Sequence, residues 1–482
     1  QDFALRNTEI ENGKISFTVE QKSGIPAPFI VSGLNNEGQV INEAWFEADK
    51  IGQIITMDCQ SCSEILLDRK KVMLEVKYTN NDSRCIELPK IHLFPKVHNK
   101  DENHLYITPA IGWNQYNGFM AGLAFYNQTL PFSKLEYSII PMYGFQNKSL
   151  TGIAGIHYSI LPDKTIFKEI KISNEFRMFS YGTDEYRAFN SDKLTTADLT
   201  YKRYSPTLTF NFRKSTPTST FSTRFILQSV HLWEDNIVYQ FYTDKPFAIE
   251  KTIYKDFYRA RFQLSDRRSI DPYSFSVGTE LNKDVGKVDL EFKYKISYKR
   301  KGKGATFRLF AGGTFEDKVN GLYGYFLSDR NAARGSTDYA YDDWYFGRTA
   351  TDGLLYHQIA LRQGAFKSYS PLGSYRDYIA ALNITLDFPI PLPIRFYADF
   401  GTTDRFKEDV KAVYDINTSI SYSAGLSISL SNETVEIFFP LFKSEEIKKY
   451  NETNKINFGE QIRFVFNIAN MKPGNIRNQL KN

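Results

Sequence analysis

The residues best suited to chemistry in this chain of 482 residues include its three cysteines, Cys59, Cys62 and Cys85. Cys59 and Cys62 have the two-residue spacing of a redox motif or of half a zinc site. A zinc site needs four ligands, and there is no second pair of cysteines. A redox motif belongs at a helix N-terminus beside a βαβ unit, which the local pattern does not predict. We therefore expect a structural disulfide and one spare thiol, in an oxidising compartment.

Histidine is the second candidate for chemistry. Zinc peptidases of one large class carry His-Glu-x-x-His on a helix, where the two imidazoles bind the metal and the glutamate acts as base. None of the six histidines of this chain is followed by Glu, so the motif is absent. His98 and His104 flank Asp101 and Glu102 and could hold a metal, but we interpret them as solvated linker residues. The sequence thus predicts no catalytic residue, no cofactor and no metal.

An aromatic and acidic stretch at residues 338–348 is the third candidate. Its adjacent carboxylates are more typical of anchors that hold a loop by hydrogen bonds than of an acid/base dyad. The candidate residues of this loop are Tyr339, Tyr341, Asp342, Asp343, Trp344 and Arg348.

The elements that position these residues are predicted to be strands. No stretch reaches the roughly 18 uninterrupted apolar residues of a spanning helix, which excludes a helical membrane protein. A mean hydropathy of −0.41 still permits a transmembrane barrel, whose strands alternate apolar and polar residues. Aromatic residues make up 15% of the chain, enough for girdles at two membrane interfaces. The net charge of +5 is spread along the chain, so nucleic acid is not an expected partner.

Residues 288–299 show the alternation most clearly. Apolar and aromatic side chains from Val288 to Tyr298 share one face, and five of the six residues on the other face are charged. In a barrel the apolar face meets lipid and the polar face lines the lumen, where a cation such as Arg259 could favour anions or be neutralised by a carboxylate such as Asp289. Many such runs exceed ten residues, which suits a tilted span of about 9–11 residues.

The predicted fold class is all-β: a 16-stranded antiparallel transmembrane β-barrel preceded by a small periplasmic β-sandwich domain. An even strand number places both termini on one side, the periplasm of a bacterial outer membrane. The strands are expected near 104–112, 117–126, 134–144, 150–160, 165–181, 197–213, 219–231, 249–264, 272–281, 287–299, 305–315, 376–388, 393–402, 413–429, 433–441 and 457–469.

Two domains follow from this reading. Residues 1–100 are predicted to form the periplasmic sandwich and a linker, because short alternating runs are separated there by turn residues. Residues 101–482 are predicted to form the barrel. The first two residues, Gln1 and Asp2, suit a mature, processed N-terminus, and a cut from a longer precursor would look the same.

The longest predicted loop spans about 316–375. Because a structureless loop of this length is uncommon, we expect it to fold over the barrel mouth or to enter the lumen. A third reading makes 321–327 and 354–366 an extra hairpin and gives eighteen strands. We prefer sixteen strands.

Two resemblances add to this reading. Residues 1–127 resemble the region that follows the catalytic part of aminopeptidase-like zinc metallopeptidases (gluzincins) of Bacteroidota, on residues 22–28, 65–68 and, most specifically, 106–119. In that group a barrel follows such a segment. The resemblance implies an outer-membrane chain related to peptidases, here without the peptidase motif.

The last 110 or so residues resemble the end of barrels from the outer-membrane assembly and two-partner-secretion superfamily. The matching stretches are 386–389, 396–401, 423–426 and 439–441. The resemblance implies sixteen strands and a long sixth extracellular loop in the lumen. The Arg-Gly-Tyr/Phe motif of that loop is not clearly present, since Arg334-Gly335-Ser336 is a poor substitute, and there is room for only one N-terminal domain.

Three functions remain open at this point. The first is a non-enzymatic scaffold or accessory subunit of an outer-membrane complex for barrel assembly or protein secretion. The second is the membrane anchor of a metallopeptidase whose catalytic part lies elsewhere. The third is a passive diffusion channel. The expected partners are the outer-membrane bilayer and other outer-membrane proteins or lipoproteins.

Overall fold

In the computed structural model the chain divides into two compact units, Gln1–Thr108 with Ala124–Glu136, and Pro109–Leu123 with Tyr137–Asn482. We call them the N-terminal unit and the sheet unit. The structure describes residues 2–467 except for 12, 23, 25, 71, 74, 76–79, 82–88, 95–103, 128–132, 188–192, 217, 241–246, 300–301, 320–322, 330–336, 373–376, 405 and 431–432. Cys85, His98 and the 334–336 segment lie outside the described residues.

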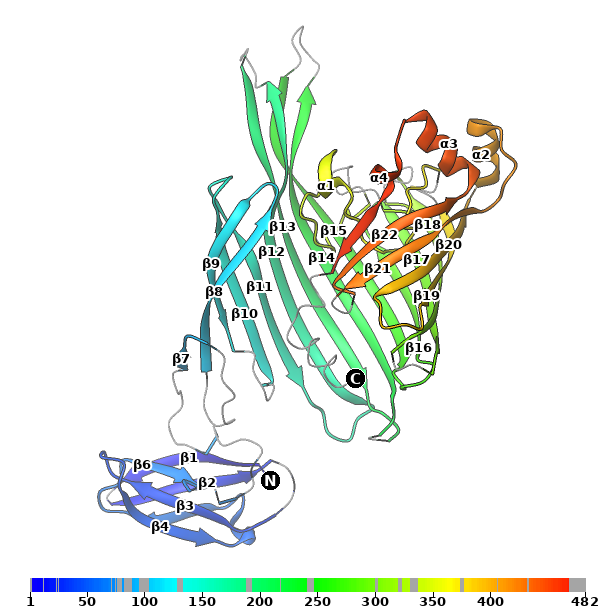
Figure 1. Ribbon diagram of the computed structural model, residues 1–482. Helices are drawn as coiled ribbons and strands as arrows, with labels where there is room; N and C mark the ends of the chain where they lie inside the picture. The colour runs from blue at the N-terminus through cyan, green and yellow to red at the C-terminus, as the bar shows by residue number, and fades with distance from the viewer. Residues whose placement is uncertain are drawn as a thin grey trace. The chain divides into compact units, whose positions relative to one another are not determined.

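The N-terminal unit contains two three-stranded antiparallel sheets (Figure 1). The first has the order β1-β2-β5 and the second the order β4-β3-β6. Alternate side chains of β2, among them Ile15 and Phe17, are fully buried in one apolar core with Phe29 and Ile65 from the second sheet. The bounds are β1 Phe3–Glu11, β2 Lys14–Gln21, β3 Phe29–Leu34, β4 Val40–Phe46, β5 Ile54–Asp58 and β6 Glu64–Leu67.

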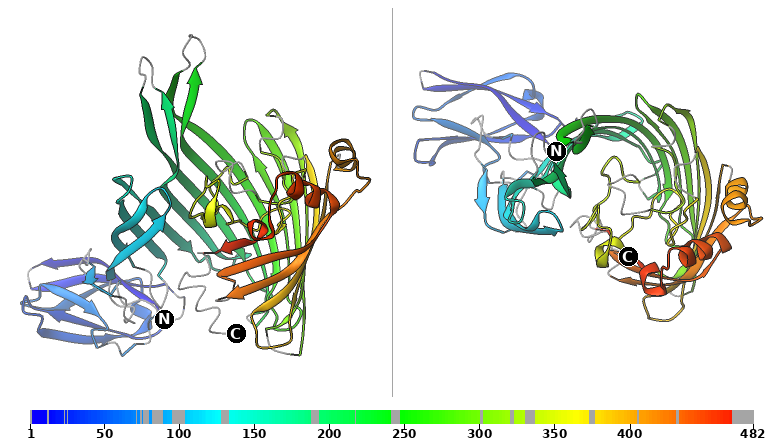
Figure 2. Two further views of the ribbon diagram at one scale, coloured as in Figure 1. Left: turned by 45° about the horizontal axis from the view of Figure 1, so that its top comes forward. Right: turned by 90° about the horizontal axis from the view of Figure 1, so that it is seen from above.

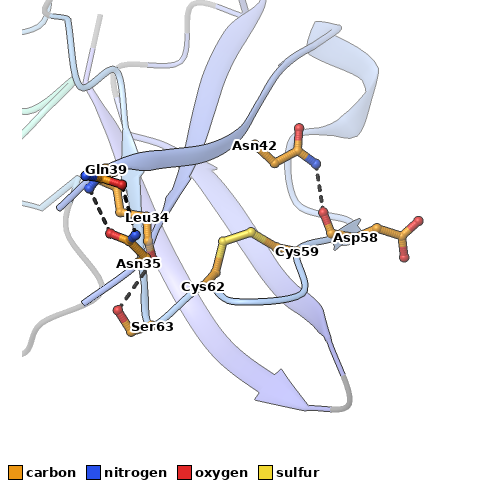
Figure 3. The surroundings of a disulfide bond; sticks show 8 residues. All are labelled: Leu34, Asn35, Gln39, Asn42, Asp58, Cys59, Cys62 and Ser63. Atoms are coloured by element: carbon orange, nitrogen blue, oxygen red, sulfur yellow. Dashed lines mark hydrogen bonds between the residues drawn. A yellow bond between two sulfur atoms is a disulfide. The ribbon is translucent and has the colours of Figure 1, made fainter. Parts of the chain in front are cut away.

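A disulfide joins Cys59 to Cys62 in the turn between β5 and β6 (Figure 3). Both cysteines are buried in the apolar core of the unit. A Cβ atom on Gly33 of β3 would come within 2.6 Å and 2.8 Å of the two sulfur atoms, so only glycine leaves room for the disulfide at this point of the strand.

A short parallel strand pair follows the core of the N-terminal unit along the chain. β7 (Lys90–His92) pairs in parallel with the start of β8 (His104–Asn114), which brings His92 Nε2 to 3.0 Å from His104 Nδ1. Among the described residues, no group of three or more His, Cys, Asp or Glu is arranged to hold a metal ion.

The sheet unit is built on one large curved sheet whose strands neighbour one another in chain order from β8 to β23 (Figures 1 and 2). The remaining bounds are β9 Gly118–Tyr126, β10 Leu135–Gly144, β11 Ser149–Ile160, β12 Phe167–Arg187, β13 Leu194–Phe212, β14 Phe221–Gln240, β15 Phe247–Asp266, β16 Tyr273–Leu281, β17 Val285–Ser297, β18 Gly304–Asp317, β19 Tyr378–Asp387, β20 Ile394–Thr403, β21 Ser421–Leu430, β22 Val435–Lys443 and β23 Arg463–Phe466.

The all-β prediction with a large antiparallel sheet is confirmed, and each predicted strand overlaps a strand of this sheet. The finer prediction, a cylinder closed by sixteen strands, is not confirmed. The short β7 also joins this set of strands, and no described register pairs β23 with β8. The extra hairpin at 321–327 and 354–366 is wrong for the described residues, where only isolated bridges and the helix α1 (Gly353–Tyr356) occur.

Helices replace two predicted strand ends. α2 (Phe406–Tyr414) occupies the start of the predicted strand 413–429, and α4 (Phe458–Gln461) occupies the start of 457–469. α4 begins with a capping box in which Asn457 and Glu460 exchange hydrogen bonds, a helix signal that the alternation hid. α3 (Glu445–Thr453) lies in the connection before α4. In the described residues, no helix has the length and apolar character needed to cross a membrane.

Burial in the large sheet is inverted relative to a water-soluble sheet. Large apolar side chains such as Leu227, Phe262 and Leu290 are exposed on one face. On the opposite face, charged side chains such as Arg203 and Asp399 are almost completely buried. Charged residues are rarely buried unless they are paired, so a second element must supply their partners on that face.

Candidate functional site

The partners of the buried charges come from the segment between β18 and β19, described at 323–329 and 337–372. This segment, which we call the inner loop, lies on the concave side of the sheet (Figure 2). It is largely buried although it contains little regular secondary structure. Whether the loop enters a barrel lumen or folds over the barrel mouth stays a prediction; its described residues lie against the concave face of the sheet.

Asp342 is the principal anchor of the inner loop. Its Oδ1 accepts hydrogen bonds from Arg203 of β13 at 2.8 Å and from Arg259 of β15 at 2.9 Å. Burial opposes ionisation of this carboxyl, but the two guanidinium groups outweigh it and hold the pKa of Asp342 well below its usual range. Arg203 also donates from Nε to the carbonyl oxygen of Ala340, at 2.9 Å. One loop residue is thereby tied to two strands.

A second carboxylate, Asp338, organises the loop from within. Its side chain is almost fully buried, and its Oδ2 accepts a hydrogen bond from Arg348 at 2.7 Å. Its two oxygens also accept the backbone N–H groups of Asp342 and Asp343, at 2.9 and 3.1 Å. Arg348 lies over the rings of Tyr341 and Tyr345, at 4.2 and 4.8 Å, which adds two cation–π contacts.

Arg362 gathers three carboxylates of the inner loop. It lies 3.0 Å from Asp338, 3.6 Å from Asp342 and 2.7 Å from Asp343. Burial raises the pKa of Asp343 to about 7; Arg362 opposes this shift, and the neighbouring carboxylates Asp338 and Asp342 add to it. Asp343 can therefore gain or lose its proton near neutral pH.

Aromatic packing fixes the same stretch against β12 and β13. Tyr341 stacks on Tyr201, with ring centroids 4.0 Å apart, and Trp344 packs edge-on against Phe179 at 5.3 Å. Arg177 of β12 also lies over the ring of Trp344, at 4.8 Å from its centroid. Such pairs are worth about 0.5–1.5 kcal/mol each beyond their buried area.

Further ion pairs hold the inner loop along the sheet. Lys287 of β17 donates to the carbonyl oxygen of Tyr323 at 2.8 Å and lies 3.2 Å from Glu280 of β16. The hydroxyl of Tyr339 also donates to Glu280. Farther along, Lys367 pairs with the fully buried Asp399 of β20 at 2.7 Å. The inner loop thus contacts β16 and β17, which precede it in the sequence, and β20, which follows it.

The inner loop also bridges the first and last strands of the sheet. The ring of Phe346 lies 6.0 Å from Trp113 of β8 and 5.0 Å from Phe466 of β23, centroid to centroid. The backbone carbonyl oxygen of Phe346 accepts a hydrogen bond from the backbone N–H of Gln115, at 2.7 Å. Gln358 forms a parallel bridge with Phe464, and the backbone N–H groups of Ile359 and Phe464 donate across it at 2.9 and 3.0 Å.

All six loop residues singled out in the sequence lie in this network. Sequence reasoning missed their partners, because an inward-facing charge on a strand does not reveal which loop residue it meets. The missed residues include Asp338, Arg203, Arg362, Glu280, Lys287 and Asp399. A charged residue at an inward position of a long alternating strand was the available signal. Each carboxylate of this network has a cationic partner. The arrangement can therefore hold the loop against the sheet and exclude water.

No protein-family model and no curated protein matches the chain. Among solved structures, the chain is similar to the crystal structure of BamA from Haemophilus ducreyi lacking POTRA domains 1-3. The identity is 13%, the match covers 73% of this chain and 71% of that chain, and the TM-score is 0.38.

Proposed function

We propose that this chain is an outer-membrane β-barrel whose lumen is filled by its own inner loop. The observation that carries the proposal is the inverted burial of the large sheet. Charged side chains are buried on the concave face, and rows of Leu, Ile, Phe and Tyr are exposed on the other. Such a surface is costly in water and favourable in hydrocarbon, where an apolar band faces lipid.

The inner loop favours a barrel with a blocked lumen over a diffusion channel. Asp342, Asp338 and Arg362 tie it to itself and to the strands across the concave face. Breaking a buried ion pair costs about 3–5 kcal/mol, so thermal motion rarely empties the lumen. We propose that the protein acts without catalysis, as a scaffold or accessory subunit of an outer-membrane complex. In this proposal the N-terminal unit is a small β-sandwich in the periplasm.

Two measurements test this proposal. The protein should fractionate with the outer membrane and aggregate when detergent is removed. Reconstituted in planar bilayers, it should conduct far less than a variant that lacks residues 337–372. A protein that is monodisperse without detergent contradicts the membrane location, and a steady open conductance in the unaltered chain contradicts the filled lumen.

The accessory role is tested by native purification in mild detergent. A stable complex with other outer-membrane proteins or lipoproteins is the expected result. Recovery of a zinc peptidase would favour the membrane-anchor reading instead, and a lone monomer would contradict the accessory role.

A further inference from the structure

The four strands β12 to β15 are longer than their neighbours and divide into two hairpins at one end (Figure 1). Described pairing between β13 and β14 ends at Tyr201 and Glu234. Pairing within the hairpins continues for six or seven more residues, to Arg187 with Leu194 and to Gln240 with Phe247. The sheet therefore forks beyond Tyr201.

The fork is held together by packing between its two hairpins. Ala197 and Leu199 of the first hairpin are buried in one cluster with Ile237 and Ala248 of the second. The hydroxyl of Tyr186 on β12 also donates to Glu250 on β15, at 2.9 Å. The base of the fork is thus a preformed feature of the fold.

A recess of about 330 Å³ lies at the base of the fork. This size falls at the lower end of the range for small-molecule sites. Its lining residues are Phe176, Thr200, Lys202, Trp233, Asp235 and Thr252.

The recess combines apolar walls with one available cation. Phe176 and Trp233 are 37% and 38% exposed, so both rings present apolar surface to a ligand. Asp235 is already engaged, because its two oxygens accept the hydroxyl groups of Thr200 and Thr252. Lys202 is exposed, and within the described part of the chain it has no ion pair or hydrogen bond. The free ammonium makes the recess suited to an anion that carries an apolar body.

The recess adjoins an outward-facing group of aromatic side chains. Tyr204, His231 and Tyr254 lie next to it, with a 2.7 Å hydrogen bond between His231 and the Tyr254 hydroxyl. Farther along the same strands the outward side chains become apolar, as at Leu227 and Phe262. Tyr and Trp gather where hydrocarbon meets lipid headgroups, so the recess lies at headgroup level if the chain spans a membrane as proposed.

We propose that this recess binds the phosphate headgroup of an anionic membrane lipid. Lys202 pairs with the phosphate, and Phe176 and Trp233 pack against the glycerol and the upper part of the acyl chains. The inference rests on the proposed membrane location and adds a specific ligand to it.

Native mass spectrometry of the full chain in a neutral detergent tests the proposal. The probes are phosphatidylglycerol, diacylglycerol with the same chains, and soluble glycerol phosphate. The variants are Lys202→Ala and Trp233→Ala, with Lys299→Ala as control, because Lys299 is an exposed lysine at the opposite end of the sheet. We expect Lys202→Ala to retain phosphatidylglycerol about fivefold less well than the unaltered chain, the effect of one lysine beside an anionic lipid.

Each outcome of this experiment either supports or overturns the lipid site. Weaker binding in Lys202→Ala and Trp233→Ala but not in Lys299→Ala, with little retention of diacylglycerol or glycerol phosphate, supports the lipid site. Equal retention by Lys202→Ala and the unaltered chain overturns it. Equal binding of glycerol phosphate and phosphatidylglycerol assigns the recess to a soluble phosphate and also overturns it. A chain that stays monodisperse without detergent overturns the membrane location. A chain that needs detergent but does not bind phosphatidylglycerol overturns only the lipid site in the recess.

Discussion

The two units use the same strand alternation with opposite results. In the N-terminal unit, Phe17 and Ile15 point into a shared core, and most charged side chains stay outside, with the buried Asp68 as an exception. In the sheet unit, Arg203 and Asp399 are buried on the concave face while Leu290 is exposed. The difference teaches that alternation alone specifies two faces and that the medium on each face decides which residues are inside.

The largest expected effect comes from the anchor of the inner loop. Asp342→Ala leaves the buried guanidinium group of Arg203 and the partly buried one of Arg259 without this partner, which should cost about 3–5 kcal/mol. Faster proteolysis within 337–372 in the folded protein measures the loss. Glu316→Ala is the control, because its pair with Lys318 is exposed and should contribute about 0–1 kcal/mol. Equal loop protection in both variants would show that the network does not hold the loop.

The second prediction compares one substitution in both units. Phe17→Ala removes a fully buried ring from the N-terminal core and should destabilise that unit by about 3–5 kcal/mol. Phe262→Ala on the outward face should cost clearly less, because lipid or detergent chains refill the space. Denaturant unfolding of the full chain, followed by protease susceptibility of each unit, gives both values. Similar losses at the two positions would mean that Phe262 packs in a protein core.

The third prediction tests the medium directly. Leu290→Arg places a charge on the proposed lipid face and should cost about 2–4 kcal/mol if the residue lies near the bilayer midplane. Trp45→Arg is the control, since Trp45 of the N-terminal unit is 58% exposed and a surface change there should stay within about 0.5 kcal/mol. Refolding into lipid vesicles measures the difference, and two neutral variants would refute a lipid-facing sheet.

The fourth prediction concerns the disulfide. Replacing Cys59 and Cys62 together by serine removes a four-residue loop closure, which the chain-entropy relation values at about 2 kcal/mol. The loss should be confined to the N-terminal unit. Protection of the inner loop against protease is the internal control, and a loss of that protection would contradict independence of the two units.

The smallest effect concerns pH. The pKa of Asp343 is raised to about 7 from an ordinary value of 3.8, so its contribution to loop docking is present below pH 3.8 and is lost as pH rises through about 7. Proteolysis of the inner loop should therefore be faster at pH 8.5 than at pH 5.5. Asp343→Asn should remove this difference. An unchanged pH dependence in that variant would assign the effect to another group.

Much of the secondary structure could be predicted from the sequence, because period-two alternation over ten or more residues leaves few alternatives. Strand ends were less accurate. The start of the predicted strand 413–429 lies in helix α2, and the alternation did not predict the fork of β12 to β15. The fork depends on packing between segments that are not adjacent in the chain, such as Leu199 and Ile237 in one buried cluster.

The sequence by itself determined the all-β character, the two-faced strands and the aromatic, acidic loop as the part that departs from the strand pattern. Only the tertiary structure decided that this loop lies on the concave face and that Asp342 meets Arg203 and Arg259. The physical reason is that alternation is a local property, whereas a buried charge is stable only when a partner distant in the chain reaches it.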